Sequence, residues 1–199
     1  MDTSKSRIDQ QFDFICEIDK EKFIGRQTYL TDAKRKENDA EHAWHLALMI
    51  MVLSEYADEH IDVFRTMCMA VIHDVIEIDA GDTYAYDAAG NKTKRERELK
   101  AAKRLFQILP EDQARYFREL WDEFEEAKTP EARFAHAMDG LQPIMLNHAT
   151  DGLAWREHQV SQDKVRTRTA KKIQPGSETL FQYVNSLIDQ NVEKGNLKK

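Results

Sequence analysis

Apolar residues recur at three- and four-residue steps along almost the whole chain, which is the spacing of one face of an α-helix. Residues that favour turns are scarce, because the 199 residues include only 7 glycines and 4 prolines. Few turns leave room for few hairpins, so this composition disfavours an all-β fold. The sequence therefore predicts an all-α fold.

Two buried helices are expected at the centre of that fold. Asn38, with Glu41 three residues later, is typical of a capping box and would open a helix over 39–56. A second apolar helix is expected over 61–78. The other expected segments are an amphipathic helix over 12–23 ended by Gly25, a polar connection over 26–37, a loop over 83–92, and helices over 93–109, from Pro110 onward, over 130–150, over 155–173 and through Ile188.

The chain has no internal repeat, low-complexity tract or linker, so a single domain is expected over residues 1–199. Its core motifs would span 26–147, and C-terminal helices over 153–190 would pack on them. The longest uninterrupted apolar run, 46–53, is far shorter than the ~20 residues that a membrane helix needs. No membrane contact is therefore expected.

The charge balance of the chain limits the kinds of partner that it can bind. Lys and Arg total 29 against 36 Asp and Glu, a net charge of −7, so no nucleic-acid partner is expected. A phosphorylated substrate would then need local positive charge, from a metal ion or a few placed arginines. Cys16 and Cys68 show no metal-type pairing, and the polar start of the chain has no secretory pattern, which predicts reduced thiols and a cytoplasmic location.

The adjacent pair His73–Asp74 is the most informative chemical feature. Neighbouring side chains on a helix point about 100° apart, so these two short side chains can bind one ion that lies between them at the helix surface. His42 and Asp139, on other helices, could complete a set of two histidines and two carboxylates. Such a set suits a divalent first-row transition metal. For His42 alone, a hydrogen-bonded core histidine is the commoner explanation.

Asp74 is harder to explain as a solvated residue, because it lies within the apolar stretch 71–76. Buried charges are rare unless they are paired or bound to a metal. Glu77 follows three residues after Asp74 and four after His73, on the same face of the expected helix. Three titratable groups on one stripe of an apolar helix favour a functional site.

The order of these residues resembles a known family. His42, His73–Asp74 and Asp139 follow the pattern of the HD-domain superfamily of metal-dependent phosphohydrolases, and the motifs ENDAEHAWHLAL and HDVIEIDAGDT resemble the bacterial 5′-deoxynucleotidases and related HD-domain proteins. The similarity covers residues 26–147. It implies a helical bundle with a metal site between central helices. It also implies that one divalent ion (Mn, Co, Zn, Fe, Ni or Mg) is bound by His42, His73, Asp74 and Asp139.

The resemblance also implies roles around the metal. Glu77 would be the acid or base beside the attacking water, and Asp82 would face the sugar and the scissile bond. Arg26 matches an arginine that holds the 5′-phosphate, provided that the connecting loop differs by one residue in length. Arg35 remains a competitor for that role. A homodimer is also implied.

Some neighbouring residues leave questions open. Deoxynucleotidases of this type carry a Trp after the phosphate-binding arginine, and Gln27 stands here instead, so selectivity for deoxyribose stays open. His45 and His136 are each three residues from an expected ligand, and hydrogen bonding or packing suits them better than ligation. Pro143 cannot donate to the carbonyl of Asp139, so a bend is expected there, either aiming Asp139 at the metal or incidental.

The expected function is hydrolysis of a nucleoside 5′-monophosphate, a (deoxy)nucleotide, to nucleoside and phosphate. Two alternatives remain: the same chemistry on another phosphorylated small molecule, or a non-catalytic metal-binding module that interacts with a partner. The basic segment RTRTAKK over 166–172 is expected to be a solvated helix face more than a partner surface.

Overall fold

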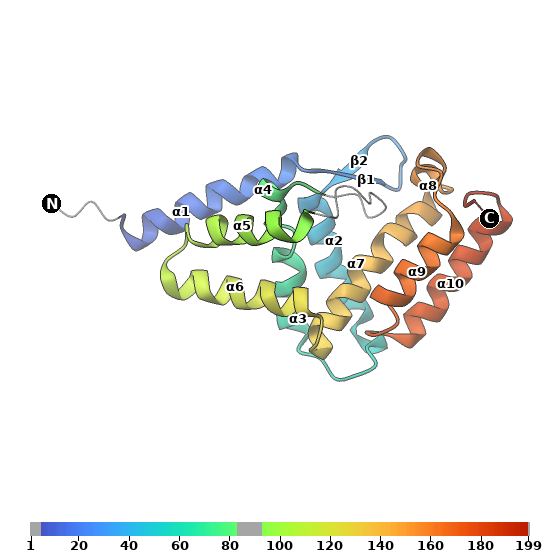
Figure 1. Cartoon of the computed structure of the whole chain (residues 1–199). Coiled ribbons are helices and arrows are strands. Elements are labelled where there is room, and N and C mark those ends of the chain that lie inside the picture. The colour runs from blue at the N-terminus through green and yellow to red at the C-terminus, as the bar shows by residue number, and fades with distance from the viewer. Residues whose placement is uncertain (1–4, 83–92, 199) are drawn as a thin grey trace.

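The computed structural model describes residues 5–82 and 93–198, so the loop expected over 83–92 lies outside the described residues. Within these residues the chain is mostly helical and has one small two-stranded sheet, which confirms the helical fold class (Figure 1). No helix among them is long and apolar enough to cross a membrane.

The first half of the described chain contains four α-helices, two 3₁₀ helices and the sheet. Their bounds are α1 (Arg7–Ile18), η1 (Asp19–Phe23), β1 (Gly25–Tyr29), β2 (Lys36–Asn38), α2 (Asp39–Leu53), η2 (Ser54–Tyr56), α3 (Val63–Ile72) and α4 (Glu77–Ala80). The second half contains α5 (Lys94–Phe106), α6 (Glu111–Glu126), α7 (Pro130–Ala149), α8 (Leu153–Glu157), α9 (Gln162–Lys172) and α10 (Glu178–Glu193).

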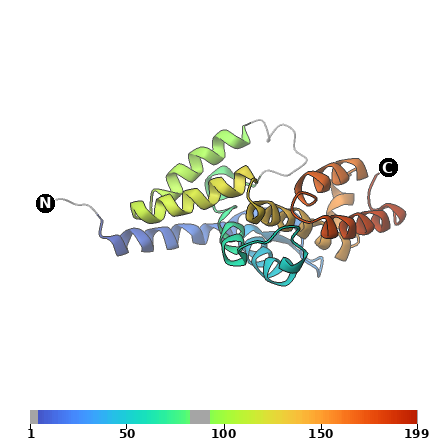
Figure 2. The ribbon, with the colours of Figure 1, turned by 90° about the horizontal axis from the view of Figure 1, so that it is seen from below.

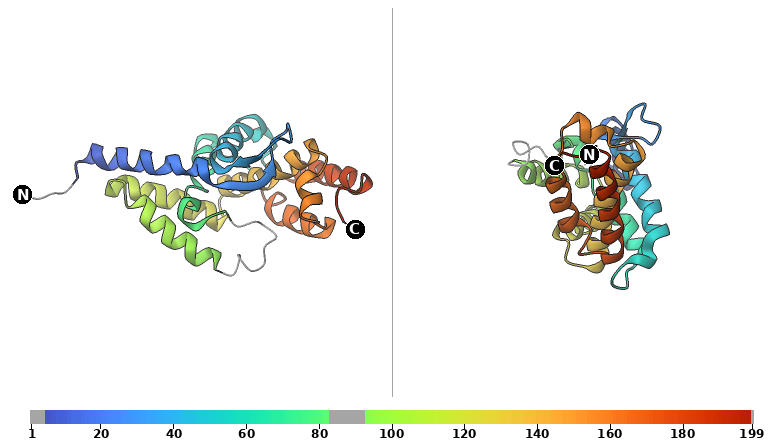
Figure 3. Two further views of the ribbon diagram at one scale, coloured as in Figure 1. Left: turned by 90° about the horizontal axis from the view of Figure 1, so that it is seen from above. Right: turned by 90° about the vertical axis from the view of Figure 1, so that its right-hand side faces the viewer.

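Helix α7 is the central element of the molecule. It packs against α2, α3 and α6, and also against the C-terminal helices α9 and α10 (Figure 1). The molecule is elongated, with α1 beside α5 at one end and α10 at the other (Figures 2 and 3). Two buried apolar clusters follow this division. One joins α2, α7, α9 and α10, and the other joins α1, α3, α5 and α6.

Capping residues set several helix starts as expected. The Glu41 amide donates to the Asn38 side chain at 2.9 Å, and the Asn38 amide donates back to the Glu41 carboxylate at 3.1 Å. This capping box starts α2 directly after β2. Thr129 caps α7: its side chain accepts from the Ala132 amide, and Pro130 follows in the first turn of the helix. Thr93 and Glu96 have the spacing of a second capping box, but this prediction is wrong, because Thr93 makes no side-chain cap hydrogen bond.

The polar connection expected over 26–37 is instead a β-hairpin. Strands β1 and β2 are antiparallel, with Gly25 opposite Asn38 and Tyr29 opposite Lys36. Strand β1 packs on α7 and α8, and this contact carries Arg26 to the middle of the molecule. The tertiary contact, which the polar sequence does not reveal, explains the difference.

The helix expected over 61–78 is interrupted at the His73–Asp74 pair. Helix α3 ends at Ile72, residues 73–76 form a turn, and α4 begins at Glu77. Within this turn the Glu77 amide donates to the carbonyl of Asp74, three residues back, at 2.8 Å. Hydrogen bonds between residues three apart wind the backbone more tightly than the four-residue bonds of an α-helix. They therefore change the directions of the side chains.

The helical segment expected over 155–173 is also divided. Helix α8 ends at Glu157, and α9 begins only at Gln162, after Gln159 adopts a φ of 52°. Helix α7, in contrast, continues past Pro143 to Ala149.

Candidate functional site

A pocket of about 440 Å³ lies between the two halves of the molecule. Its wall is built by β1, the turn after α3, α5, α7 and α9. Several residues expected to form a site line this pocket. They are Arg26, His73, Asp74, Glu77, Asp82 and Asp139.

The two histidines are buried next to the pocket. His42, in the first turn of α2, is fully buried, and its Nε2 lies 3.2 Å from Oδ1 of Asp139. His73 donates through Nδ1 to the carbonyl of Ala70 at 2.8 Å. A carbonyl can only accept, so Nδ1 carries a proton, and in the neutral imidazole Nε2 then has a lone pair that a metal can take. That Nε2 is buried and has no hydrogen-bond partner.

Carboxylates surround these nitrogens. His42, His73 and Asp139 each offer one ligand atom, and the three atoms lie within 4.8 Å of one another. Oδ2 of Asp74 lies 3.1 Å from Nε2 of His73 and 3.9 Å from Nε2 of His42. Two imidazoles, two carboxylates and an unpartnered ring nitrogen fit a divalent transition metal, because these are the donors that such ions take. A second acidic group, Asp39 with Asp74 and Glu77, lies beside the first.

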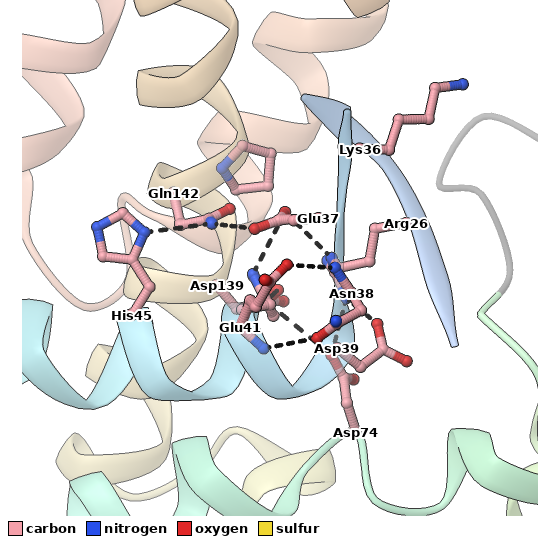
Figure 4. A network of polar contacts seen from close by, with 12 residues as sticks. Arg26, Lys36, Glu37, Asn38, Asp39, Glu41, His45, Asp74, Asp139 and Gln142 are labelled. Atoms are coloured by element: carbon pink, nitrogen blue, oxygen red, sulfur yellow. Dashed lines mark hydrogen bonds and ion pairs between the residues drawn. The ribbon is translucent and has the colours of Figure 1, made fainter. Parts of the chain in front are cut away.

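Arg26 lies among these carboxylates, as Figure 4 shows. Its Nη1 donates to Asp74 at 2.9 Å and to Asp39 at 3.1 Å, and its Nε lies 3.4 Å from Glu37. Burial alone would lower the pKa of this guanidinium, but the charges of Asp74, Asp82 and Asp39 outweigh burial and raise it. Arg26 therefore keeps its charge inside the protein.

Arg35, the competitor for phosphate binding, lies elsewhere. Its side chain is 56% exposed and donates to both carboxylate oxygens of Glu41, at 2.8 and 2.5 Å. It does not line the pocket. The structure thus brings Arg26, and not Arg35, to the expected metal ligands.

The electrostatics of the cluster follow from burial and mutual charge. Burial, followed by the charges of Asp74 and Asp82, raises the pKa of Glu77 to about 11. Burial also raises the pKa of Asp82. Burial lowers the pKa of His42 to about 4, whereas at His73 the effect of burial is outweighed by Asp74, which raises the pKa to about 9. The cluster thus contains both proton-holding and charged groups at neutral pH.

Comparison with known proteins decides the family. The HD-domain family model matches residues 18–181 of this chain. The chain belongs to the HD-domain family.

Individual relatives agree with this assignment. The chain is 32% identical over 114 residues to the bovine protein 5′-deoxynucleotidase HDDC2, an alignment that covers 57% of this chain and 54% of the relative. The fission-yeast 5′-deoxynucleotidase hdd1 is 29% identical over 115 residues, 56% of this chain and 57% of that protein. The match therefore spans about half the length of these curated relatives.

A solved structure matches the HD domain over nearly its whole length. The Magnetospirillum magnetotacticum protein named "Predicted metal-dependent phosphohydrolase" superposes with a TM-score of 0.93 at 48% identity, covering 98% of this chain and 97% of that one. A conserved hypothetical protein from Pyrococcus furiosus shares the fold, with a TM-score of 0.61 and 23% identity over 92% of this chain and 99% of the other.

Within this HD domain, sequence reasoning missed several site residues. Lys172 of α9 contacts Oδ2 of Asp139, although the basic segment that contains it was expected to be a solvated face. The sequence did carry a signal for Lys172. It follows the buried residues Val165 and Thr169 by seven and three positions, a spacing that puts all three near one face of the helix. Glu37 and Asp39 are 2% and 0% exposed, and no pattern in the sequence distinguishes them from the polar residues around them.

Gln142, also missed, links two parts of the site. Its Nε2 donates to Oε2 of Glu37 at 2.7 Å and lies 3.4 Å from Nδ1 of His45 (Figure 4). Its position three residues after Asp139 on α7 was a signal, because that spacing puts both side chains on one face. His45 thus contacts the site through Gln142.

Other histidine and tryptophan residues differ in whether they line the pocket. His136 donates through Nε2 to the carbonyl of Phe124 at 2.8 Å, and its ring stacks on the Phe124 ring with centroids 4.1 Å apart. Trp44 is 64% exposed and does not line the pocket. Gln27 does line it, as does Trp155 of α8, which the sequence had not placed near the site.

Proposed function

We propose that this HD domain is a metal-dependent phosphohydrolase that releases phosphate from (deoxy)nucleoside 5′-monophosphates. The supporting observation is the buried set of His42, His73, Asp74 and Asp139 beside Arg26 at one pocket. The names of the relatives, 5′-deoxynucleotidase and metal-dependent phosphohydrolase, agree with this chemistry.

In this proposal His42, His73, Asp74 and Asp139 hold one divalent ion. The ion, when bound, lowers the pKa of a water and polarises the phosphoryl oxygens. Hydrogen bonding of His73 Nδ1 to Ala70 keeps its Nε2 free to bind, as such backbone bonds do for metal-bound histidines.

The remaining side chains act on the substrate. Arg26 holds the phosphate and shares its guanidinium between phosphate and the carboxylates of Asp74 and Asp39. Glu77 and Asp82 line the same pocket and handle the proton of the attacking water or of the leaving 5′-oxygen. Arg35, paired with Glu41 on the surface, takes no part.

A phosphate-release screen tests this function. The purified chain is incubated with ribo- and deoxyribonucleoside 5′-monophosphates, with sugar phosphates and with p-nitrophenyl phosphate, each with Mn²⁺, Co²⁺, Mg²⁺ or Zn²⁺ and with a chelator. The proposal expects metal-dependent release from nucleoside monophosphates above the other substrates. Release from sugar phosphates alone would move the activity to another phosphorylated small molecule, and no release with any metal would contradict the enzyme.

We also propose that the protein is a cytoplasmic homodimer. Helix α2 supports the dimer because it exposes an apolar stripe at helical spacing, with Trp44, Met51 and Val52 exposed by 64%, 55% and 70%. Val52→Glu should then shift the mass measured by light scattering from dimer to monomer, whereas Tyr183→Glu on α10 should not. A wild-type chain that is monomeric at all concentrations would contradict this part of the proposal.

A further inference from the structure

Helix α9 presents two cations to the pocket. Arg168 and Lys172 are four residues apart, so they lie on one side of α9, and both line the pocket. Lys172 is anchored there, because its ammonium contacts Asp139. The two helices are very close at this point: a Cβ on Gly140 of α7 would lie 3.0 Å from Cβ of Lys172. The position of α9 against the expected metal site is therefore well defined.

Arg168 differs from the other lysines and arginines of the pocket. Each of the others has a carboxylate partner: Arg26 with Asp74, Lys94 with Glu98, Arg95 with Glu125 and Lys172 with Asp139. Within the described parts of the chain, 5–82 and 93–198, Arg168 makes no hydrogen bond or ion pair, although it is only partly exposed. It also lies beside a like charge, because Lys172 follows four residues later on the same side of α9.

This arrangement costs stability unless an anion is present. Like charges four residues apart on a helix repel each other, and a half-buried guanidinium gives up water without gaining a partner. A dianionic phosphate would relieve both costs. A guanidinium also matches two phosphate oxygens with two parallel N–H groups, which an ammonium cannot do.

We propose that Arg168 binds the substrate's phosphate from the α9 side of the pocket, opposite Arg26 on β1, while Lys172 fixes the position of α9 at Asp139. The inference rests on the proposed function, because it takes a phosphate monoester as the ligand. It assigns to the C-terminal part of the domain a share in substrate recognition.

Steady-state kinetics provide the first test. Arg168→Ala should raise KM for a nucleoside monophosphate about 10-fold or more with kcat nearly unchanged, because a contact made in both ground and transition states affects binding alone. Arg168→Lys should recover part of the loss. The matched control is Arg166→Ala, since Arg166 is on the same helix but pairs with Asp189 of α10, and its KM should equal that of wild type. Equal KM values for Arg168→Ala and wild type would overturn the proposal.

Phosphate binding without turnover provides the second test, and it separates this inference from the proposed function. Inorganic phosphate should raise the melting temperature of the metal-loaded wild type and of Arg166→Ala, and it should do so much less for Arg168→Ala. A nucleoside without phosphate should affect all three proteins equally. If the wild type releases no phosphate from any substrate but this pattern holds, the anion site stands and the enzyme proposal fails. Equal phosphate stabilisation of all three proteins would overturn the anion site.

Discussion

Glu37 lies next to several parts of the site. It is 2% exposed, accepts from Gln142 at 2.7 Å, and its Oε1 lies 3.4 Å from Nε of Arg26 and 3.9 Å from Nδ1 of His42. A carboxylate behind a metal-binding histidine orients the ring and increases its basicity. At 3.9 Å Glu37 makes no hydrogen bond to His42, so we expect it to act on His42 and Arg26 through its charge.

Replacement of Glu37 should weaken metal binding without unfolding the chain. Glu37→Gln should lower Mn²⁺ affinity about 10- to 100-fold, measured by isothermal titration calorimetry, because such outer partners have that effect. Glu41→Gln is the control: glutamine also completes a capping box, and Glu41 pairs with Arg35 on the surface. An unchanged affinity in Glu37→Gln would remove this role.

Glu77 should separate chemistry from binding. Glu77→Gln keeps the size of the side chain and removes its proton-transfer capacity, so turnover should fall by roughly 10²–10⁴ while metal content stays that of wild type. The measurement is kcat for phosphate release beside elemental analysis of the same sample. Turnover within a few-fold of wild type would transfer the role to Asp82.

Glu21 should make stability depend on pH. It is 8% exposed, and burial, followed by the charge of Asp74, raises its pKa from 4.5 to about 7. A carboxyl group whose pKa is raised in the folded state favours folding most below pH 4.5. The free energy of unfolding then falls as the pH rises from 4.5 to about 7. The loss is at most about 3 kcal/mol.

Glu21→Gln removes that titration. In the presence of a chelator, the free energy of unfolding of Glu21→Gln should rise relative to that of wild type between pH 4 and pH 8. Urea titrations at both pH values measure the difference. The same difference at pH 4 and pH 8 would show that Glu21 titrates normally in the folded protein.

At the scale of elements, the start of α8 depends on a glycine. Gly152 has a φ of 69°, and a Cβ there would lie 2.5 Å from Cβ of Asn196, near the C-terminus. Gly195 has a φ of 76° but nothing within 4 Å of its added Cβ. A residue with a side chain would be strained at either position, and only at Gly152 would its Cβ also meet another side chain.

This pair allows a controlled measurement. Gly195→Ala should cost about 1 kcal/mol of stability from the left-handed conformation alone. Gly152→Ala should cost about 1–3 kcal/mol more, because Asn196 must move. Denaturant unfolding measures both. Equal losses in the two variants would mean that the contact between Gly152 and Asn196 is easily relieved.

The predictability of each element depended on whether its cause was local. The start of α2 could be predicted, because the Asn38–Glu41 capping box is a contact between residues three apart. The hairpin of β1 and β2 could not, because its polar sequence is held by packing on α7 and α8. The turn at 73–76 could not either, because an apolar run has the same pattern in a helix and in a tight turn.

The residues of the candidate site could likewise be predicted where a short local motif marks them, and not where distant packing brings them together. Residues with short motifs, such as His73–Asp74, were found, and the structure brings them next to His42 and Asp139. Lys172 and Arg168 were not found, because they reach the pocket only through the packing of α9 on α7. Gln142 and Glu37 are joined across 105 positions of sequence, a pairing that one sequence does not reveal.

At the scale of the whole molecule, the site lies where the two apolar clusters meet. His42 belongs to α2, beside the cluster that contains Leu46 and Met138, whereas His73 follows α3 next to the cluster that contains Ile72 and Trp121. Asp139 of α7 lies between them. A divalent ion shared by these side chains would therefore link both halves of the fold and stabilise it by binding.

Metal content measured on two proteins tests whether the buried histidines and carboxylates bind a divalent ion. Wild type and His73→Ala are dialysed against Mn²⁺, desalted and subjected to elemental analysis, with circular dichroism confirming that both remain helical. The assignment of His73 as a ligand predicts one ion per wild-type chain and almost none in His73→Ala, because the variant loses the unpartnered Nε2 of the site. Equal metal content in the two folded proteins would contradict it.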